Sequence, residues 1–271
     1  MKKNSVDYSI VIPAYNSAKH IEKAVLSCIN QTFQPGEIII IDDGSTDDTY
    51  ELLKKINSPL IRIYQNKINK GVSYSRNVGI KKSRCAWVLF LDADDIFHKY
   101  KLETLDMIIS KNNHIRVLAH EFVVSLNQEK LNMIEISKDF KLKKVKLRKL
   151  LFKNLFVTPS VAFYRKSGVL FDESFTHAED HDFLLRLLER EIEFWYFNSI
   201  LCSISRFPLS PGGLSSNNLK MRFGELKLYK NFCERNKLLL LLPFLYSFSG
   251  LKHIRRFLLT YFLFICVLVF L

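Results

Sequence analysis

The sequence predicts an α/β protein built on a mostly parallel sheet with helices on both of its faces. Within about the first hundred residues, strand-like and helical patterns alternate four times. Two of the apolar runs, 37–41 and 87–91, lead directly into carboxylates. Such alternation favours parallel strands joined by right-handed crossovers. Ligands bind at the carboxyl ends of these strands, so the two acidic clusters are expected at one binding edge.

Each early element has a local justification. The first four strands are expected at residues 8–12, 37–41, 60–64 and 87–91, which are short apolar runs bounded by polar residues. Pro13 ends the first of them. Ser17 and Ser73 are placed as N-caps of the helices that follow, because a serine hydroxyl can accept a free N–H group of the first helical turn.

Composition narrows the class of protein. The chain has 271 residues with 48% hydrophobic content, enough for one large domain or a domain with an appendage. A net charge of +13 points to nucleic acid, an anionic membrane or a phosphorylated substrate. The five cysteines include no C-x-x-C pair, so neither a zinc site nor a disulfide framework is indicated. The N-terminus lacks the apolar core of a signal peptide, so the protein is expected inside the cell.

The acidic cluster Asp92, Asp94 and Asp95 follows the fourth strand. Three carboxylates this close repel one another, and a Mg²⁺ or Mn²⁺ ion that bridges to substrate phosphates would relieve the repulsion. After the second strand, Asp42 and Asp43 can accept hydrogen bonds from a base or a ribose hydroxyl. The alternative is that both clusters only form solvated turns or cap the next helix.

The segment from Asn69 to Asn77 offers groups that could bind an anion. Gly71 allows close approach of the backbone, and Arg76 lies about one turn into the expected helix. A helix start combined with a guanidinium suits a diphosphate. The alternative is that Arg76 is solvated on the helix face.

Four segments together resemble the signatures of family 2 glycosyltransferases, in the family's order and at its spacing: Val11–Asn16, Ile41–Asp47, Asn69–Gly71 with Ser75–Asn77, and Leu91–Asp95. The resemblance implies a GT-A (Rossmann-like) fold, a nucleotide-sugar donor, a divalent metal (Mn²⁺ or Mg²⁺) and inversion at the anomeric carbon. It covers about residues 8–216.

The resemblance also implies roles for single residues. For the donor, Pro13, Ala14 and Tyr15 would line the nucleoside, Asp43 would meet the base with support from Asp42, and Asn69 and Arg76 would lie near the nucleotide. Asp92 would contact the ribose or the metal, and Asp94 would be the main metal ligand. Asp95 would orient the loop.

The second half of the chain carries the expected catalytic base. A helix begins at about Glu179, and an inverting transfer needs one base to take the proton of the acceptor hydroxyl. The resemblance assigns this role to Asp180, with Glu179 positioning it. His177 and His181 flank the pair and leave a ligand role open.

Other elements of this half are expected from periodicity: a helix at 100–110, a β-hairpin from strands 115–125 and 130–136, a strand-like run at 158–166, and a helix at 217–236. Residues 138–153 hold eight basic residues in an amphipathic pattern. This stretch would touch anionic lipid or an acceptor diphosphate, or would simply be a solvated helix face.

Arg206 is followed by Pro208, where many relatives have a histidine, so a histidine role there is in doubt. Arg206 and Ser215 remain candidates for the donor, and Gly212 and Gly213 would let this loop move as a lid.

The chain ends in residues 257–271, an uncharged apolar run of fifteen. A spanning helix needs ~20 residues, so a monotopic or shallowly inserted helical tail is expected. A tilted or re-entrant hairpin and the buried helix of a soluble dimer are the alternatives. The expected organisation is a GT-A domain at 1–236, with a nucleotide-binding half at 1–97 and an acceptor-binding half at 98–236, followed by a membrane-associating tail at 237–271.

The function expected from these observations is an inverting transfer of a sugar from a nucleotide-diphosphate donor, with UDP as the family-weighted choice. The acceptor would be a lipid-linked glycan of cell-surface polysaccharide synthesis, at the cytoplasmic face of the inner membrane. No nucleic-acid partner is expected, and the oligomeric state is open. Two other classes remain: a metal-dependent nucleotidyltransferase, which gives no reason for Glu179 and Asp180, and a non-catalytic membrane-bound scaffold.

Overall fold

The computed structural model describes residues 7–137, 139–190, 192–206 and 217–254. These residues divide into two compact units. The first holds the described residues up to 174 together with 180–206, and the second holds 175–179 together with 217–254. The expected boundary between a domain at 1–236 and a tail at 237–271 stays a prediction.

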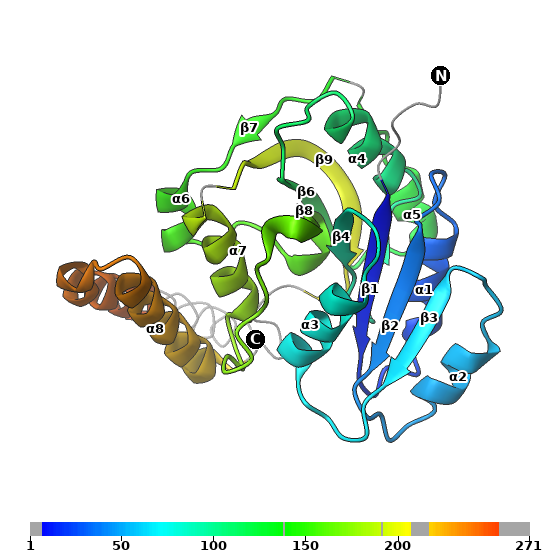
Figure 1. Cartoon of the computed structure of the whole chain (residues 1–271), viewed down its shortest axis with the longest axis horizontal. Helices are drawn as coiled ribbons and strands as arrows, with labels where there is room; N and C mark the ends of the chain where they lie inside the picture. The colour runs from blue at the N-terminus through cyan, green and yellow to red at the C-terminus, as the bar shows by residue number, and fades with distance from the viewer. Residues whose placement is uncertain (1–6, 138, 191, 207–216, 255–271) are drawn as a thin grey trace, which may run out of the picture. The chain divides into compact units, whose positions relative to one another are not determined.

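Nine strands of the described chain form one sheet in the order β3-β2-β1-β4-β8-β6-β9-β5, with β7 paired to β9 (Figure 1). β1 is parallel to β2 and β4, and β2 is parallel to β3, whereas β8 is antiparallel to both β4 and β6. The sheet is therefore parallel in its first half and mixed in its second. The strands are β1 Tyr8–Ala14, β2 Glu37–Asp42, β3 Ile61–Gln65, β4 Trp87–Phe90, β5 Ile96–Phe97, β6 Val117–Val124, β7 Lys143–Lys144, β8 Val161–Tyr164 and β9 Phe194–Ile204.

Helices cover both faces of this sheet. Side chains alternate along β1, so Ile10 and Ile12 share a buried cluster with α1 and α4, while Val11 faces α3 at Gly79. The helices are α1 Ile21–Ile29, α2 Thr49–Lys55, α3 Val72–Lys82, α4 Lys101–Ile109, α5 Gln128–Asn132, α6 Leu147–Phe152, α7 Glu179–Glu189 and α8 Asn218–Arg235.

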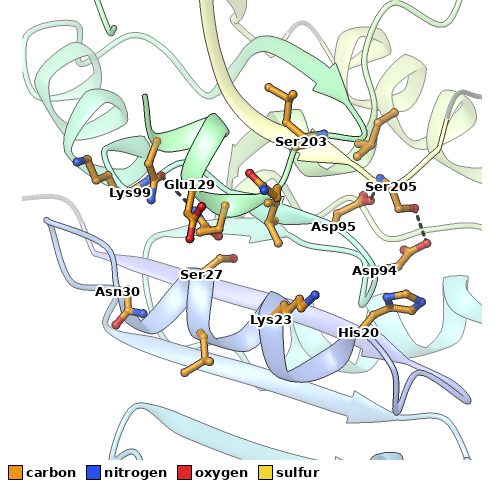
Figure 2. Close-up of a pocket in the computed structure, with 17 residues that line it drawn as sticks. His20, Lys23, Ser27, Asn30, Asp94, Asp95, Lys99, Glu129, Ser203 and Ser205 are labelled. Carbon is orange, nitrogen blue, oxygen red and sulfur yellow. Dashed lines mark hydrogen bonds between the residues drawn. The ribbon is translucent and has the colours of Figure 1, made fainter. Parts of the chain in front are cut away.

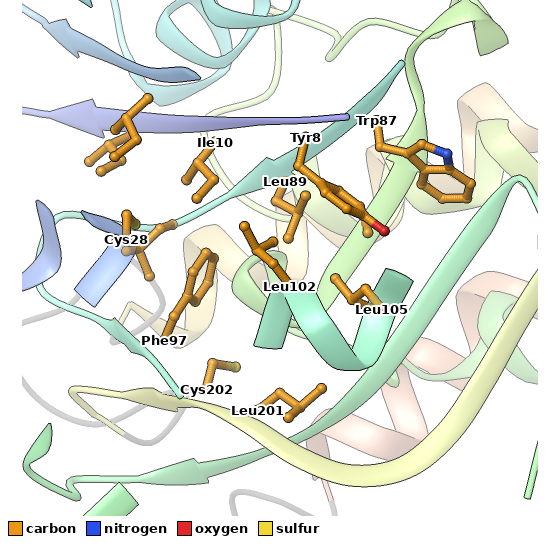
Figure 3. Close-up of a cluster of buried hydrophobic side chains, with 14 of the residues drawn as sticks. Tyr8, Ile10, Cys28, Trp87, Leu89, Phe97, Leu102, Leu105, Leu201 and Cys202 are labelled. Carbon is orange, nitrogen blue, oxygen red and sulfur yellow. The ribbon is translucent and has the colours of Figure 1, made fainter. Parts of the chain in front are cut away.

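The core lies between the parallel strands and the helices α1 and α4. Every residue of β1, β2 and β4 is buried, which explains their nearly continuous apolar sequences. Figure 3 shows Leu102 and Leu105 of α4 beside Tyr8 and Leu89, and the same cluster contains Cys28. Burial of each large apolar side chain contributes about 1.5–3 kcal/mol, so this layer stabilises the strands that carry the acidic residues.

The long strand β9 curves around the second half of the sheet (Figure 1). Its register with β6 shifts on both sides of Glu121, and such irregularities bend a strand. At its far end Ser203 pairs with Ile96 of β5. The residues that follow β9 therefore return to the acidic loop after β4.

The first four strands and the helices between them are confirmed, but their predicted N-caps are wrong. α1 begins at Ile21, and Ser17 contributes its carbonyl oxygen, which accepts the N–H of Ile21 at 2.9 Å. α3 begins at Val72, after Gly71 with a φ of 90°. Only a glycine adopts this conformation easily, so the turn ends two residues before Ser73. Ser73 is buried in the first helical turn instead.

The predicted β-hairpin is wrong as well. β6 forms, but it pairs with β8 and β9, and the segment expected as its partner begins with the short helix α5. The side chain of Asn127 accepts the N–H of Lys130 at 2.9 Å, which is a helix cap, and Leu131 packs into the interior. A local cap therefore overrides the alternating pattern.

The basic stretch at 138–153 is not one amphipathic helix. Lys143 and Lys144 form the exposed strand β7 against β9, and the separate helix α6 buries Leu150 and Leu151. The predicted helix at 217–236 is confirmed as α8. No helix within the described ranges has the length and apolar character needed to cross a membrane. The apolar run at 257–271 lies outside those ranges.

A buried carboxylate links two helical segments within the second unit. Glu225 of α8 accepts hydrogen bonds from Ser249 and Lys252 of the helical residues 242–254. Burial would raise the pKa of Glu225, but these donors and His253 outweigh it and lower the pKa. The ion pair therefore joins the two helical segments of this unit.

We expect Gly79→Ala to destabilise the protein, although alanine is normally the better helix former by about 1 kcal/mol. A Cβ at Gly79 would lie 2.1 Å from a methyl carbon of Val11 on β1. Overpacking of this kind typically costs about 1–3 kcal/mol. Urea denaturation measures the change, with the exposed Lys81→Ala on the same helix as control. Equal stability of the two variants would contradict the close packing of α3 on β1.

Candidate active site

The carboxyl ends of the parallel strands bring the two acidic clusters to one edge. Ala14 at the end of β1 is opposite Asp42 at the end of β2, and the Ala14 carbonyl accepts the N–H of Asp43 at 2.8 Å. On the other side of β1, Val11 is opposite Phe90, and Asp92 follows two residues later. The acidic residues after β2 and β4 therefore flank the end of β1, as the alternating pattern predicts.

Asp43 organises the loop after β3. Its Oδ1 accepts hydrogen bonds from the Asn66 amide at 2.7 Å and the Lys70 N–H at 3.0 Å, and its Oδ2 accepts the Gly71 N–H at 2.8 Å. A carboxylate offers about four acceptor positions, so roughly one remains for an outside donor. Asp42 is wholly buried and accepts from Ser45 and Gln65, which makes it a support for the turn.

Hydrogen bonds join the loop after β1 to the loop after β2, and the side chain of Tyr15 remains exposed. Asn16, with a φ of 48°, accepts the Thr46 N–H at 2.8 Å, and its own N–H donates to the Ser45 hydroxyl. Pro13 and Ala14 are buried in β1, whereas Tyr15 is 47% exposed. Of these three predicted nucleoside residues, Tyr15 has the side chain that can stack on a ligand.

Gly44 and Asn69 show how closely the loop after β2 approaches the loop after β3. Gly44 has a φ of 73°, and a Cβ there would lie 2.8 Å from the backbone of Ile68. Asn69 is exposed, and its side chain accepts the Gly71 N–H at 3.1 Å. The predicted donor residue Asn69 therefore also shapes the start of α3.

Arg76 is buried and paired with Asp92, so it is not solvated on the helix face. The guanidinium donates to Asp92 at 2.8 Å and lies 5.3 Å from the centre of the Phe171 ring and 6.0 Å from that of Phe90. A charge this deeply buried needs its partner. The pair therefore fixes the direction of Asp92, which is the second residue predicted as a metal ligand.

The residues after β9 hold the rest of the acidic loop. The Ser205 hydroxyl donates to Asp94 at 2.6 Å, and the exposed Arg206 donates to the same oxygen at 3.2 Å. The Ser205 N–H donates to Asp95 at 2.8 Å. Burial, reinforced by the charges of Asp92 and Asp94, raises the pKa of Asp95 to about 8. Asp95 thus reaches inward to the strand end while Asp94 stays at the surface.

The carboxylates at this edge can bind a hard divalent cation only if a substrate supplies further oxygen ligands. Across the described ranges, no three His, Cys, Asp or Glu side chains are grouped to hold a metal ion. Asp92 and Asp94 each keep one carboxylate oxygen without a hydrogen bond from the described residues. Mg²⁺ binds such oxygens through one or two carboxylates and takes its other ligands from phosphates and water. The two residues therefore fit the ion expected from the sequence.

Asp180 lies in the first turn of α7 and borders the aromatic cluster behind Arg76. Its Oδ2 accepts the Asn154 amide at 2.8 Å, and its Oδ1 accepts the His181 N–H at 2.8 Å. A small cavity lined by Asp180 also touches Phe90 and Phe171, the two rings beneath Arg76. This small cavity thus lies between the predicted base and the two rings beneath Arg76, a residue predicted for the donor. Glu179 opens α7 and belongs to the second unit.

His181 is engaged elsewhere. Its ring is buried, and Nε2 makes a hydrogen bond with the Leu150 carbonyl. His177 contacts the Thr176 hydroxyl through Nδ1. The predicted loop with Ser215, Gly212 and Gly213 lies outside the described residues.

Sequence reasoning missed two residues that position site carboxylates. Ser205 binds both Asp94 and Asp95, and Asn154 binds Asp180. The one available signal for Ser205 is its place directly before Arg206. Asn154 stands in an irregular segment and carries no local signal.

A cleft of about 530 Å³ adjoins the acidic loop and runs along α1 (Figure 2). Asp94 and Asp95 lie at one end of its lining, with His20 beside Asp94. Among the residues that the structure describes, none of the others predicted for the donor or for catalysis lines it.

The fold and this edge of acidic residues define a GT-A-like protein, and comparison with known proteins identifies the family. Residues 9–170 match the family described as Glycosyl transferase family 2, so the chain belongs to that family. An uncharacterized glycosyltransferase of Haemophilus influenzae is 27% identical over 223 residues, which cover 82% of this chain and 86% of that protein. One of Rickettsia bellii is 40% identical over 107 residues, 40% of this chain and 16% of that protein.

Solved structures support the same fold. Staphylococcus aureus TarS 1–349 in complex with UDP-GlcNAc has a TM-score of 0.66 at 21% identity, covering 84% of this chain and 66% of that one. The longer TarS structure has a TM-score of 0.63 at 21% identity, and this chain covers 84% of its own length but 40% of that structure. Several relatives are therefore much longer than the segment they share with this chain.

We expect Arg76→Met to lower the free energy of unfolding by about 2–3 kcal/mol, because it leaves Asp92 without its partner at a partly buried position. Urea denaturation measures the loss. Adding Asp92→Asn to Arg76→Met should recover part of it, because the unpaired charge is then removed. The exposed pair of Lys54 and Glu51 supplies the control, and Lys54→Met should leave stability unchanged. Wild-type stability of Arg76→Met would contradict the buried pairing.

Proposed function

We propose that this protein is an inverting glycosyltransferase that moves a sugar from a nucleotide-diphosphate donor, a UDP-sugar, to a hydroxyl of a membrane-linked glycan in cell-surface polysaccharide synthesis. The observation that carries the proposal is the edge at which Asp43, the Arg76–Asp92 pair and the Asp94 loop converge. Membership of glycosyl transferase family 2 supports it, as does the likeness to TarS, which has been solved with UDP and with UDP-GlcNAc.

The donor would be recognised by groups that remain available at this edge. Asp43 has an acceptor position for a base N–H, and Tyr15 presents an exposed ring for stacking. Asp92, held by Arg76, would contact the ribose or the metal. Arg206 is half exposed beside Asp94 and would meet the diphosphate with a guanidinium.

Asp92 and Asp94 would hold the divalent ion, Mn²⁺ or Mg²⁺. When bound there, the ion would supply positive charge that stabilises the departing diphosphate. The protein's own part is to keep the two carboxylates apart and oriented, through Arg76 for Asp92 and Ser205 for Asp94.

Asp180 would be the general base. As the acceptor oxygen forms its bond to the anomeric carbon, the bond from that carbon to the diphosphate breaks, and its electron pair leaves with the nucleotide. The acceptor proton passes to a carboxylate oxygen of Asp180, which Asn154 holds in place. Attack from the face opposite the leaving group inverts the anomeric carbon. Glu179 would help to position this turn.

The test is a donor screen with the full-length protein, a panel of nucleotide sugars, and Mn²⁺, Mg²⁺ or a chelator. We expect slow release of a nucleoside diphosphate from one donor, lost with the chelator. Asp180→Asn should keep donor binding and lower transfer by about 10²–10⁴-fold, the usual contribution of a general base. The exposed Asp139→Asn is the matched control. Release of pyrophosphate from a nucleoside triphosphate would indicate a nucleotidyltransferase, and full transfer by Asp180→Asn would refute the base.

We place the protein at the cytoplasmic face of the inner membrane, as a peripheral or monotopic protein. The support is a concentration of exposed apolar side chains in the second unit. Leu240 is 97% exposed, and Leu238, Leu239, Leu241 and Phe244 around it are exposed as well. Exposed apolar side chains this close together in the sequence of a basic protein suit an anionic lipid surface. The sequence continues into the uncharged run at 257–271.

We expect the double substitution of Leu239→Ser and Leu240→Ser to weaken binding to phosphatidylglycerol vesicles by at least about tenfold, because each buried leucine contributes about 1.5–3 kcal/mol. Vesicle flotation measures the binding. Met133→Ser, at an exposed apolar position of the first unit, is the control. Unchanged flotation of the double variant would refute a role for this surface.

A further inference from the structure

The cleft along α1 has three walls. One is α1 with His20 before it, another is α5 with Lys99 beside it, and the third is the end of β9. We call this the α1–α5 cleft. Its volume of about 530 Å³ falls within the range of about 300–1,000 Å³ that is usual for ligand sites. It meets the proposed catalytic edge at one end, where Asp94 lies.

The walls are held by hydrogen bonds within the protein. The Ser27 hydroxyl donates to the Ala24 carbonyl at 2.7 Å and accepts the Phe97 N–H at 3.1 Å. The Asn132 side chain accepts the Lys99 N–H at 2.9 Å. Such bonds tie α1 to β5, and the segment just after β5 to α5, which restrains the walls of the cleft.

Other polar side chains belong to the lining as well. In the described part of the chain, the side chains of Lys23, Asn30 and Glu129 take part in no hydrogen bond or ion pair, and all three are exposed. Lys23 and Asn30 are seven residues apart and so lie on one face of α1, about 10 Å apart along its axis. Glu129 faces them from α5 (Figure 2). These groups are available to a ligand.

The charges around the cleft bear on the class of ligand. Two carboxylates, Asp94 and Glu129, line it together with two lysines, Lys23 and Lys99, whereas Asp95 is turned inward and accepts the Ser205 N–H. The two carboxylates balance the two lysines, so the charges of the lining select neither an anionic nor a cationic ligand. A neutral molecule with many hydroxyls both donates and accepts, and suits this mixture.

The apolar part of the lining fits the same class. Leu26 of α1 faces the cleft, as do Leu126 and Ile204 beside α5 and β9. Sugar rings carry apolar C–H faces between their hydroxyls, so they bury area on such side chains while their hydroxyls reach the polar groups.

We propose that the α1–α5 cleft binds neutral sugar units of the acceptor glycan, beyond the unit that receives the transferred sugar. The proposal rests on the proposed glycosyltransferase function. The length of the cleft along α1 and its connection to the acidic loop at one end fit a chain of sugars that enters the catalytic edge. The cleft would hold the glycan in register and so favour acceptors of sufficient length.

The test is isothermal titration of the full-length protein with neutral trisaccharides, maltotriose and triacetylchitotriose, and with trigalacturonate as an anionic counterpart. We expect a neutral trisaccharide to bind and the anion to bind at least tenfold more weakly. Asn30→Trp fills the cleft from an exposed position of α1 and should weaken the neutral ligand at least tenfold. Glu22→Trp, exposed on the same helix outside the lining, should leave binding unchanged.

Binding of UDP and UDP-GlcNAc to the same variants distinguishes failure of the proposed function from failure of the acceptor assignment. If neither nucleotide binds the wild type, the proposed donor is wrong, whatever the trisaccharides do. If Asn30→Trp weakens UDP-GlcNAc but not UDP, the cleft takes the donor sugar, and the acceptor assignment is overturned. Absence of binding by both neutral trisaccharides, equal binding by Asn30→Trp and wild type, or tighter binding of the anion would refute the proposal.

Discussion

The crowding of carboxylates at one edge of the sheet is the constraint on which the rest of the site depends. Two unit charges about 4 Å apart interact by about 4 kcal/mol at the effective dielectric near a protein surface, so each carboxylate after β4 needs a partner. Asp92 has Arg76, and Asp94 has Ser205 and Arg206. Asp95 is the buried member, and its raised pKa means that it holds a proton more readily than its neighbours.

These partners come from distant parts of the chain, which couples the acidic loop to the whole of the first unit. Arg76 precedes Asp92 by 16 residues, and Ser205 follows Asp94 by 111. Ser205 reaches the loop because β9 bends across the sheet and ends beside β5. A change in the curvature of β9 would therefore alter the geometry around Asp94 without touching any residue of the loop.

The proposed chemistry divides along the same lines. The proposed donor groups lie at the strand ends and beside the buried Arg76, whereas the proposed base Asp180 lies on α7 and is held by the side chain of Asn154. The aromatic cluster of Phe90, Phe171 and Phe183 lies between Arg76 and Asp180. The rings of Phe171 and Phe183 are stacked, with their centres 4.2 Å apart. Rigid packing there would keep the base and the donor groups at a constant separation, which is what an in-line displacement requires.

Local sequence patterns predicted the parallel half of the sheet. They also predicted that Asp43 and Asp92 lie at the same edge of it. They failed where one side chain decides the backbone, as at Asn127, whose cap replaces a strand with α5, and at Gly71, which starts α3 before Ser73. A cap is a single contact and leaves no repeating pattern in the sequence. The alternation of apolar and polar residues therefore led to the prediction of a strand where a helix forms.

The sequence by itself determined which strands are buried on both faces and which carboxylates follow them, because an apolar run and the acids after it are contiguous in the chain. Tertiary structure decided which group each carboxylate meets and where a cleft opens. The bonds from Ser205 to Asp94 and from Asn154 to Asp180, and the facing of Lys23 and Glu129, each join residues far apart in the sequence. Such contacts follow from how the strands and helices pack, and they leave no trace in local spacing.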